Sequence, residues 1–455
     1  MPTKKSSPQS LRTFKTTDED FIEPWSRVCD RSFPRPNASA RQGVVREIQK
    51  VRQKGDSALL SLGSNICERV LDLIEVSREE WDRGCEAVDS ADRAALGKAA
   101  MRIRDFHRKR IPGSWEVREE GGAFMGQRVR PLSSVGIFSD SAVALKPSQI
   151  IMYATPASAV EVPEISLALA PESAGGIRPE LLMAARLSGV HRIFKMSGVP
   201  AVAAFALGTQ TVPRVEKLVG PGGSEIEVAR SELGMEAGIL TQALPTRLCV
   251  VADKTATPAW LAADLLAHAQ TSAAACAVLL THWKNGPARV EAEVMRQLEG
   301  LDGSRKLKQS LLSRLILVGT RSLSESLELA DVYAPDHLAA AVAHPDEVLR
   351  SVQNAGAILM GHYTPASVSH TLAGPGNANP WGSSPRFASP LVAEDFLKKS
   401  HFVQFEASKL RELGHDAIRL SELDSLGTRG ASVELRLKRI RRARREREMA
   451  REAEL

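Results

Sequence analysis

Short apolar segments alternate with segments of helical periodicity through the centre of the chain, between residues 161 and 281. Strands connected by helices form parallel sheets that the helices cover, so the predicted fold class is α/β. The predicted strands are residues 161–170, 192–195, 217–219, 248–253 and 277–281, and the predicted helices are residues 179–188, 201–207, 224–233 and 258–270.

The regions on either side of this centre are less regular. Residues 1–20 are predicted to form a mobile arm. From residue 44 the pattern predicts a helix, a stop at Gly55 and a second helix capped by Asp56. The remaining predictions are helix over residues 78–110, short strands with turns over 124–153, and charged helix after 395.

Length and cysteine content limit the class of protein. A chain of 455 residues is too long for one simple core and suits two domains. Its five cysteines are scattered, without a Cys-x-x-Cys pair, which argues against a disulfide framework or a thiolate zinc site. No apolar run is long enough to span a bilayer, and the first residues lack a signal segment. These features predict a cytoplasmic protein without membrane contact.

The net charge of +6 is concentrated at the end of the chain, where residues 436–455 hold nine Lys or Arg and four Glu. Such a segment could bind nucleic acid or another acidic surface. The alternative is a solvated helix with Arg–Glu pairs at helical spacing. The second interpretation is favoured, because no aromatic side chains are interleaved to stack on bases.

A glycine-rich turn, Val-Gly-Pro-Gly-Gly, occupies residues 219–223 directly before a predicted helix. Glycines allow close approach of an anion, and a helix start directs its N–H groups toward it, so the turn could hold a phosphate. It lacks the full G-x-G-x-x-G pattern, and a tight strand-to-helix turn explains it equally well.

Ten short motifs follow one another over roughly residues 44–435. They are residues 104–107 (Arg-Asp-Phe-His), 147–148, 154–156, 206–209, 219–222, 251–253, 263–266 (Ala-Asp-Leu-Leu), 334–338 (Ala-Pro-Asp-His-Leu), 373–375 (Ala-Gly-Pro) and 432–434. This ordered set resembles the histidinol dehydrogenase family. The resemblance implies two interleaved Rossmann-like domains and a helical C-terminal tail exchanged across a homodimer. It also implies the family reaction, oxidation of L-histidinol to L-histidine in two hydride transfers to NAD, with zinc holding the substrate.

The domain boundaries follow from this resemblance. They are an N-terminal arm (1–43), a discontinuous first domain (44–143 and 247–394), an inserted nucleotide-binding-like domain (144–246) and a helical tail (395–455), basic at its end.

The family's catalytic Glu-His pair corresponds to Asp336 and His337, which can exchange a proton near neutral pH. Its zinc ligands correspond to His268, Thr271, His370 and Arg429. Arginine has no lone pair to give a metal and threonine is a poor zinc ligand, so we expect no bound zinc.

Other positions that the resemblance assigns also differ from the family. The cofactor-binding positions are Lys146, Pro200, Gly220, Gly222 and Gly223, and the substrate-binding positions are Thr246, Arg247, His268, His370, Asn377, Asp424 and Arg429. The family has Asn in place of Gly223 and Pro-Gly-Gly in place of residues 140–142. Replacement of Tyr by Lys146, Glu by Arg247, Asp by His370 and His by Arg429 adds positive charge, which predicts an anionic small-molecule substrate.

Three functions remain open at this stage. The chain is a divergent NAD-dependent dehydrogenase acting without zinc on a hydroxyl-bearing substrate, or an inactive homologue that binds a ligand or partner. The third function is association with nucleic acid through the basic tail.

Overall fold

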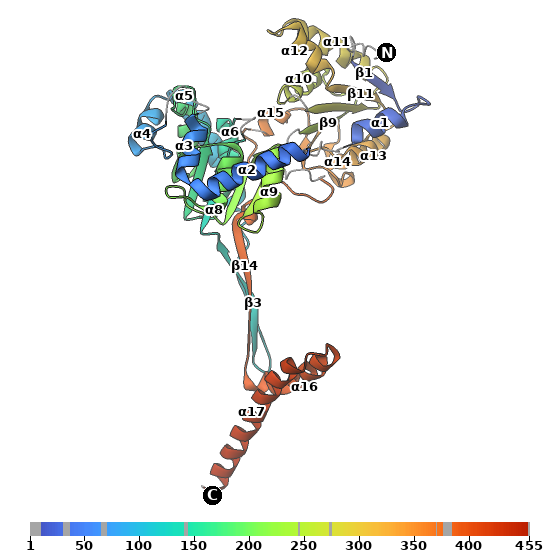
Figure 1. Cartoon of the computed structure of the whole chain (residues 1–455). Coiled ribbons are helices and arrows are strands. Elements are labelled where there is room, and N and C mark those ends of the chain that lie inside the picture. Colours follow the sequence, from blue (N-terminus) through green and yellow to red (C-terminus); the bar gives the residue numbers. More distant parts are fainter. Residues whose placement is uncertain are drawn as a thin grey trace. The chain divides into compact units, whose positions relative to one another are not determined.

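The computed structural model describes residues 11–30, 37–64, 71–140, 144–243, 246–272, 275–369, 371–375 and 385–453. The chain divides into two compact units, one formed by Met1–Ile111 with Leu132–Phe396 and the other by Pro112–Pro131 with Leu397–Leu455. The first unit contains two parallel sheets covered by helices, which confirms the predicted α/β class. The second contains a three-stranded antiparallel sheet and two helices (Figure 1).

The first parallel sheet has six strands in the order β1-β11-β10-β9-β12-β13. They are β1 (Arg12–Lys15), β9 (Arg247–Ala252), β10 (Cys276–Thr281), β11 (Leu315–Gly319), β12 (His337–Ala341) and β13 (Ala357–Met360). Its helices are α1 (Ile22–Cys29), α10 (Pro258–Ala269), α11 (Gly286–Glu299), α12 (Arg305–Leu312), α13 (Leu323–Tyr333), α14 (Pro345–Ser351) and α15 (Ala366–Ser369). Along β9, Leu248 and Val250 pack with α10 and α11 on one face, and Cys249 and Val251 pack with α1 and α13 on the other.

The second parallel sheet has five strands in the order β6-β5-β4-β7-β8. They are β4 (Ser134–Phe138), β5 (Glu164–Leu169), β6 (Arg192–Lys195), β7 (Lys217–Gly222) and β8 (Gly238–Ala243). The helices that accompany it are α2 (Ala38–Lys54), α3 (Asp56–Ser64), α4 (Arg78–Glu86), α5 (Ser90–Arg108), α6 (Pro147–Ala159), α7 (Pro179–Ser188), α8 (Gly198–Leu207) and α9 (Ser224–Leu233), and the short 3-10 helix η1 (Ala393–Phe396) packs on α6. The chain runs from β4 outward to β5 and β6, then returns to β7 on the other side of β4. The topological switch point of this sheet therefore lies between β4 and β7.

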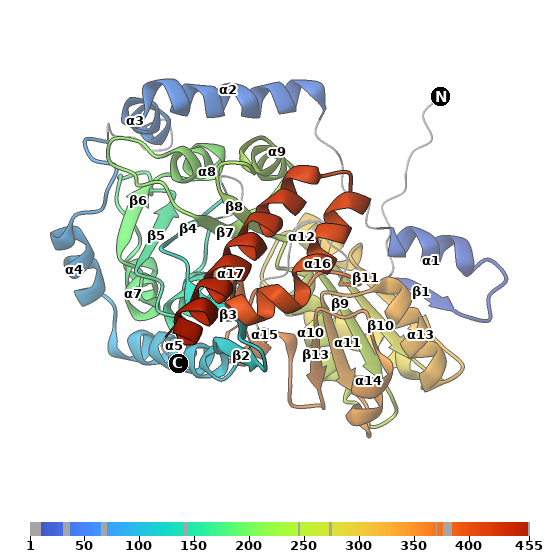
Figure 2. The same cartoon turned by 90° about the horizontal axis from the view of Figure 1, so that it is seen from below.

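Two N-terminal segments join sheets that the sequence did not assign to them. Residues 12–15, predicted to be part of a mobile arm, form the edge strand β1 and pair with β11. Residues 44–143 were predicted to belong with 247–394, but β4 pairs with β5 and β7 of the five-stranded sheet. Helix α2 likewise packs on α8 and α9 through Val44, Ile48 and Val51 (Figure 2). The reason is that local patterns identify strands and helices but not their partners.

The second unit begins its C-terminal part with a strand and not with the helix predicted from residue 395. Strand β14 (Leu397–Phe405) pairs antiparallel along its whole length with β3 (Ala123–Pro131), which also pairs with β2 (Trp115–Glu119). The predicted helices follow only after it, as α16 (Ala407–Leu423) and α17 (Gly427–Ala453) (Figure 1). The partner of β14 lies more than 260 residues earlier in the chain, so no local signal marks it as a strand.

Several helix and strand predictions are confirmed and others are corrected. The predicted limits of α7, β6 and α9 are those observed. The predicted helix over residues 78–110 is two helices, because Asp89 accepts the N–H groups of Ala91 and Asp92 and starts α5. The strands predicted up to residue 153 give way at Pro147 to α6, whose almost complete burial removes the polar face that would have marked it as a helix.

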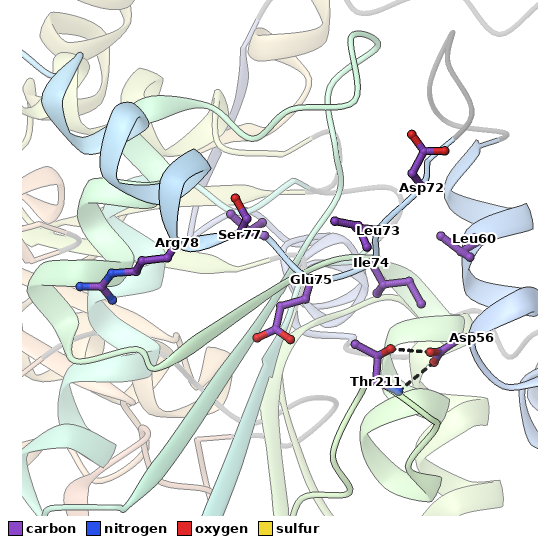
Figure 3. A pocket seen from close by; sticks show the side chains of 10 residues that line it. Asp56, Leu60, Asp72, Leu73, Ile74, Glu75, Ser77, Arg78 and Thr211 are labelled. Carbon is purple, nitrogen blue, oxygen red and sulfur yellow. Dashed lines mark hydrogen bonds between the residues drawn. The ribbon is translucent and has the colours of Figure 1, made fainter.

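Asp56 does not cap a helix as predicted; it links α3 to the turn after α8. Its carboxylate accepts hydrogen bonds from the hydroxyl and the backbone N–H of Thr211 (Figure 3). It also accepts one from the hydroxyl of Thr209. Burial acts to raise the pKa of Asp56, but these hydrogen bonds outweigh it, and the pKa lies below the ordinary aspartate value. Asp56 therefore stabilises the fold as an anion.

Residues 72–78 run along the edge strand β6 and cover it. The same residues line a cavity of 420 Å³ (Figure 3). Lys195 donates its N–H to the Ile74 carbonyl, and Val76 donates to the Ile193 carbonyl. The Arg192 guanidinium grips the Glu75 carboxylate with two hydrogen bonds. This segment protects an edge that would otherwise offer free backbone groups to another chain.

The glycine-rich turn is partly strand. Strand β7 continues through Gly222 and pairs with β8 as far as Ala243. A Cβ at Gly220 would lie 2.4 Å from the Phe138 carbonyl oxygen, and one at Gly222 would lie 3.0 Å from Ile226. Close packing of β7 against the end of β4 therefore requires Gly220, whether or not a ligand binds there.

Two sequence-level expectations concern the whole chain. Among the described residues, no helix combines the length and apolar character needed to cross a membrane. The described cysteines are Cys29, Cys85, Cys249 and Cys276, and all of them are free thiols. Cys67 lies outside the described residues.

We predict that Asp56→Ala lowers the free energy of unfolding by about 1–3 kcal/mol, because three hydrogen bonds lose their charged acceptor. Because the pKa of Asp56 is lowered in the fold, its contribution is present above the ordinary aspartate pKa and is lost as the pH falls through the folded pKa. Urea denaturation at neutral and acid pH measures both effects. Asp72→Ala, at an exposed carboxylate of the same cavity, is the control and should change stability by less than about 0.5 kcal/mol.

We also predict that Gly220→Ala destabilises the protein by about 1–3 kcal/mol, because its Cβ would collide with backbone. Gly97→Ala in α5 is the control, since a Cβ there meets nothing within 4 Å. That change should stabilise the protein by up to about 1 kcal/mol. Thermal denaturation compares the two variants, and an unchanged melting temperature for Gly220→Ala would show that packing does not require the glycine.

Candidate active site

Five of the predicted site residues gather at one edge of the six-stranded sheet. Thr246 and Arg247 stand at the start of β9, Asp336 and His337 at the start of β12, and His268 in the last turn of α10. Strands β9 and β12 are parallel neighbours, with His337 opposite Leu248. Parallel neighbours begin at the same edge, and this brings together residues about 90 positions apart in the sequence.

The catalytic pair predicted from the sequence is buried. Asp336 is 1% exposed, and its Oδ2 accepts the backbone N–H of Arg247 at 2.7 Å. His337 is fully buried, and its ring lies edge-on to that of His268, with centroids 6.3 Å apart. The carboxylate therefore anchors the start of β9 to β12, and the two imidazoles form one compact polar group.

His268 is oriented by the neighbouring strand. Its Nε2 lies 3.2 Å from the Thr246 carbonyl oxygen and 3.5 Å from the Thr246 hydroxyl. Since a carbonyl oxygen only accepts hydrogen bonds, this contact requires the proton on Nε2, and the lone pair of the neutral ring is then on Nδ1. The hydroxyl of Thr271 donates to the His268 carbonyl. Thr271, which occupies the second of the family's zinc positions, thus caps a carbonyl at the end of α10.

One of the family's four zinc positions, His370, lies outside the residues that the structure describes. No cluster of three or more His, Cys, Asp or Glu side chains with a metal-binding arrangement occurs among those residues. Two predicted site residues, His370 and Asn377, lie outside them.

The side chain of Arg247 is engaged within the fold. Its Nη1 donates to the Cys29 carbonyl at 3.2 Å and its Nη2 to the Asp30 carbonyl. The guanidinium also lies over the ring of Tyr333, 5.2 Å from its centroid. Both carbonyls are at the C-terminal end of α1, where a cation is favourable. Arg247 therefore fastens α1 to the sheet, a role that the sequence does not reveal.

Two further predicted residues belong to the second unit. Asp424 ends α16 and Arg429 lies in the first turn of α17, and their side chains pair at 3.8 Å. They are 62% and 68% exposed, so the pair contributes little to stability.

Asp264 is a candidate that the sequence motifs contained but did not single out. It lies one helical turn before His268 in α10, and this spacing places both side chains on one face. Burial raises the pKa of Asp264 to about 6. A carboxyl group that titrates near neutrality is typical of general acids and bases. The signal in the sequence was an aspartate within an otherwise apolar helix, four residues before a histidine.

The predicted cofactor positions surround the switch point of the five-stranded sheet. Gly220 and Gly222 are part of β7, and Gly223 is the N-cap of α9. Lys146 is the exposed N-cap of α6, and Pro200 lies in the first turn of α8, where proline is tolerated.

The N–H of Gly223, the group expected to meet a phosphate, already has a partner. It donates to Oδ2 of Asp140 at 2.8 Å. A phosphate oxygen that accepted this N–H would have to displace the Asp140 carboxylate.

Comparison with known proteins identifies the family. The family model described as histidinol dehydrogenase matches residues 34–437. A histidinol dehydrogenase of Geobacter sulfurreducens is 39% identical over 431 residues, covering 94% of this chain and 100% of the relative. That of Geobacter metallireducens is also 39% identical, over 400 residues, covering 87% and 92%.

A solved structure agrees with these sequence relatives. The crystal structure of histidinol dehydrogenase from Elizabethkingia anophelis is 25% identical to this chain and superposes with a TM-score of 0.86. The match covers 95% of this chain and 99% of that one. The family consists of NAD-dependent oxidoreductases of histidine biosynthesis, and the resemblance seen in the sequence motifs is confirmed. The chain belongs to the histidinol dehydrogenase family.

Proposed function

We propose that the protein is a dehydrogenase that oxidises a hydroxyl-bearing substrate with NAD as the oxidant, as in its family. The observation that carries this proposal is the convergence of Thr246, His268, Asp336 and His337 at one edge of the six-stranded sheet. Family membership over residues 34–437 supplies the reaction class.

In this proposal His337 accepts the proton that the substrate releases. Oxidation of a hydroxyl group removes a hydride from carbon and a proton from oxygen, and a neutral imidazole can accept that proton. Asp336 acts as a positioning residue, because its carboxylate is held by the Arg247 N–H at the start of β9. Asp264, with its pKa near 6, is available as a second proton acceptor on the face of α10 that carries His268.

The proposed enzyme works without the zinc of its family. Two features support this part of the proposal: the Thr271 hydroxyl donates to the His268 carbonyl, and arginine occupies position 429. Arginine remains protonated at any working pH and offers no lone pair.

The proposed substrate is anionic, because Lys146, His370 and two arginines replace neutral, acidic or metal-binding residues of the family. The geometry weakens the contribution of both arginines. Arg247 is bonded to the end of α1, and Arg429 is paired with Asp424. Comparison of histidinol with anionic hydroxy acids as substrates decides the sign of the charge that the site accepts.

A catalytically inactive homologue that binds a ligand or partner is the second candidate. The observation in its favour is the hydrogen bond from the Gly223 N–H to the Asp140 carboxylate, because this N–H in the glycine-rich turn is then engaged within the protein. A thermal shift assay with NAD separates the two candidates, because a ligand that binds only the native state raises its melting temperature. The dehydrogenase requires a shift, and the inactive homologue does not.

The second unit supports a proposal that the protein is a homodimer. Among its described residues the buried hydrophobic side chains are Ala123 and Leu437. Large apolar side chains are instead exposed on its strands and helices, at Trp115, Val403, Leu420, Leu423 and Leu435. A unit with so little core of its own needs another surface to cover it, and we propose that a second copy of the chain supplies that surface.

The charges of α17 favour the solvated-helix interpretation of the basic tail over nucleic-acid binding. Three of its basic side chains pair with glutamates at i,i+4 spacing: Lys438 with Glu434, Arg442 with Glu446 and Arg444 with Glu448. Such pairing reduces the charge that is free to meet a phosphate backbone.

We predict that His337→Gln lowers kcat at least about 100-fold, because the proton acceptor is lost. The measurement is NADH formation with histidinol and with anionic hydroxy acids. His344→Gln, at an exposed histidine in the same sheet region, is the matched control and should keep full activity. Full activity in both variants would remove His337 from the chemistry.

We predict that dialysis against a chelator leaves activity unchanged and that metal analysis finds less than stoichiometric zinc. The physical reason is that Arg429 has no lone pair to give a metal and that Thr271, a poor zinc ligand, donates its hydroxyl to the His268 carbonyl. One zinc per subunit, lost together with activity and restored by added zinc, would show the zinc-free proposal to be wrong.

We predict that the protein is a dimer by light scattering and that Leu423→Glu with Leu435→Glu weakens association at least tenfold. These side chains are 68% and 66% exposed in the single chain, and charge would oppose their burial against a partner. Met235→Glu, at a 98% exposed side chain of the first unit, is the control and should leave the dimer intact. A monomeric wild type would contradict the proposal.

A further inference from the structure

Asp140 and Gly223 meet at the place where α/β sheets bind their ligands. Asp140 follows the end of β4, Gly223 follows the end of β7, and the switch point of the five-stranded sheet lies between these two strands. Ligands of such sheets bind in the crevice at the carboxyl ends of the strands on either side of the switch point. The Asp140 carboxylate, 6% exposed, accepts the Gly223 N–H at 2.8 Å across this crevice.

The backbone holds Asp140 in this position. The preceding residue, Ser139, donates its N–H to the Ala168 carbonyl of β5. Its carbonyl accepts the N–H of Gly198 at the start of α8, at 2.8 Å. The backbone directly before Asp140 is therefore held from two sides, by the sheet and by a helix.

The two partners also fit each other sterically. A Cβ at Gly223 would lie 3.3 Å from Oδ2 of Asp140, which is closer than ordinary contact. By the resemblance, the family carries Asn at position 223 and Pro at position 140. Both positions differ in this chain, and the two differences are complementary. Gly223 has no side chain, and the Asp140 carboxylate occupies the space beside it.

The start of α9 already carries an excess of negative charge. Glu225 lies in its first turn, in addition to the Asp140 carboxylate at the N-cap, whereas Glu227 of the same turn is paired with Arg230 at 2.8 Å. Burial, and after it the negative charge of Glu225, raise the pKa of Glu47 on the neighbouring helix α2. A helix N-terminus stabilises one anion well, but a second anion at the same N–H groups meets repulsion from the first.

We propose that Asp140 is a specificity-determining residue that occupies the anion position at the N-terminus of α9 and keeps phosphate groups away from it. The crevice then favours a group that donates a hydrogen bond to Asp140, such as a ribose hydroxyl, over a pyrophosphate. This inference rests on the proposed function in taking NAD as the cofactor, and it deepens that function by making NAD a weakly held one.

Calorimetric titration of the full-length protein tests the proposal with three probes: NAD, inorganic pyrophosphate and adenosine. Asp140→Asn keeps an acceptor for the Gly223 N–H and removes only the charge. We expect it to bind NAD and pyrophosphate at least about tenfold more tightly than the wild type, with adenosine changed less than twofold. Glu225→Gln is the matched control, since it removes an exposed charge from the same turn, and its gain should stay below about threefold.

Three results would overturn the proposal. They are equal affinity of wild type and Asp140→Asn for NAD, absence of NAD and pyrophosphate binding in both, and an equal gain in Glu225→Gln. Asp140→Ser, which also offers a neutral acceptor oxygen, replaces Asp140→Asn if that variant fails to fold. Binding is measured without turnover, so an inactive protein whose Asp140→Asn variant gains NAD affinity would reject the dehydrogenase proposal and support this one.

Discussion

The pairing of β9 with β12 is the contact on which the candidate site depends. Because these strands run parallel and begin at one edge, Arg247 and Asp336 meet there, and the Asp336 carboxylate closes the gap by accepting a backbone N–H. Helix α10 runs back along the sheet and delivers His268 to the same edge, where Thr246 orients it. The site is thus assembled from three segments by one sheet register. A shift of that register would separate the Arg247 N–H from the Asp336 carboxylate.

The polar groups lie at the start of the strands in one parallel sheet and at the end of the strands in the other. In the six-stranded sheet the histidines gather where β9 and β12 begin, whereas in the five-stranded sheet Asp140 and Gly223 follow the strand ends beside the switch point. The close approach of Gly220 to Phe138 makes the second arrangement possible, because it lets β7 run tightly along β4. Packing therefore accounts for Gly220 and Gly222, two of the three glycines that the sequence offered as a phosphate cradle.

Two charged side chains that the sequence assigned to other roles form hydrogen bonds within the fold. Arg247, which the sequence suggested as a residue that binds an anion, donates hydrogen bonds to two carbonyl groups at the end of α1. Asp56, which appeared to be a helix cap, holds two threonines of a distant turn. In both cases a charged side chain satisfies backbone or hydroxyl groups that folding would otherwise bury without a partner, and such groups are costly to leave unsatisfied.

The sequence by itself determined the α/β class, the limits of elements such as α7 and α9, and the family, because these depend on periodicity, capping and ordered motifs. It also named the residues that gather around His268 and His337. Only the tertiary structure decided that β14 is a strand, that β4 joins the five-stranded sheet, and that the Gly223 N–H meets Asp140. Those facts depend on partners that lie 30 to 282 residues away in the chain. The physical reason is that hydrogen bonds and burial are properties of pairs of segments, and a local pattern specifies only one member of each pair.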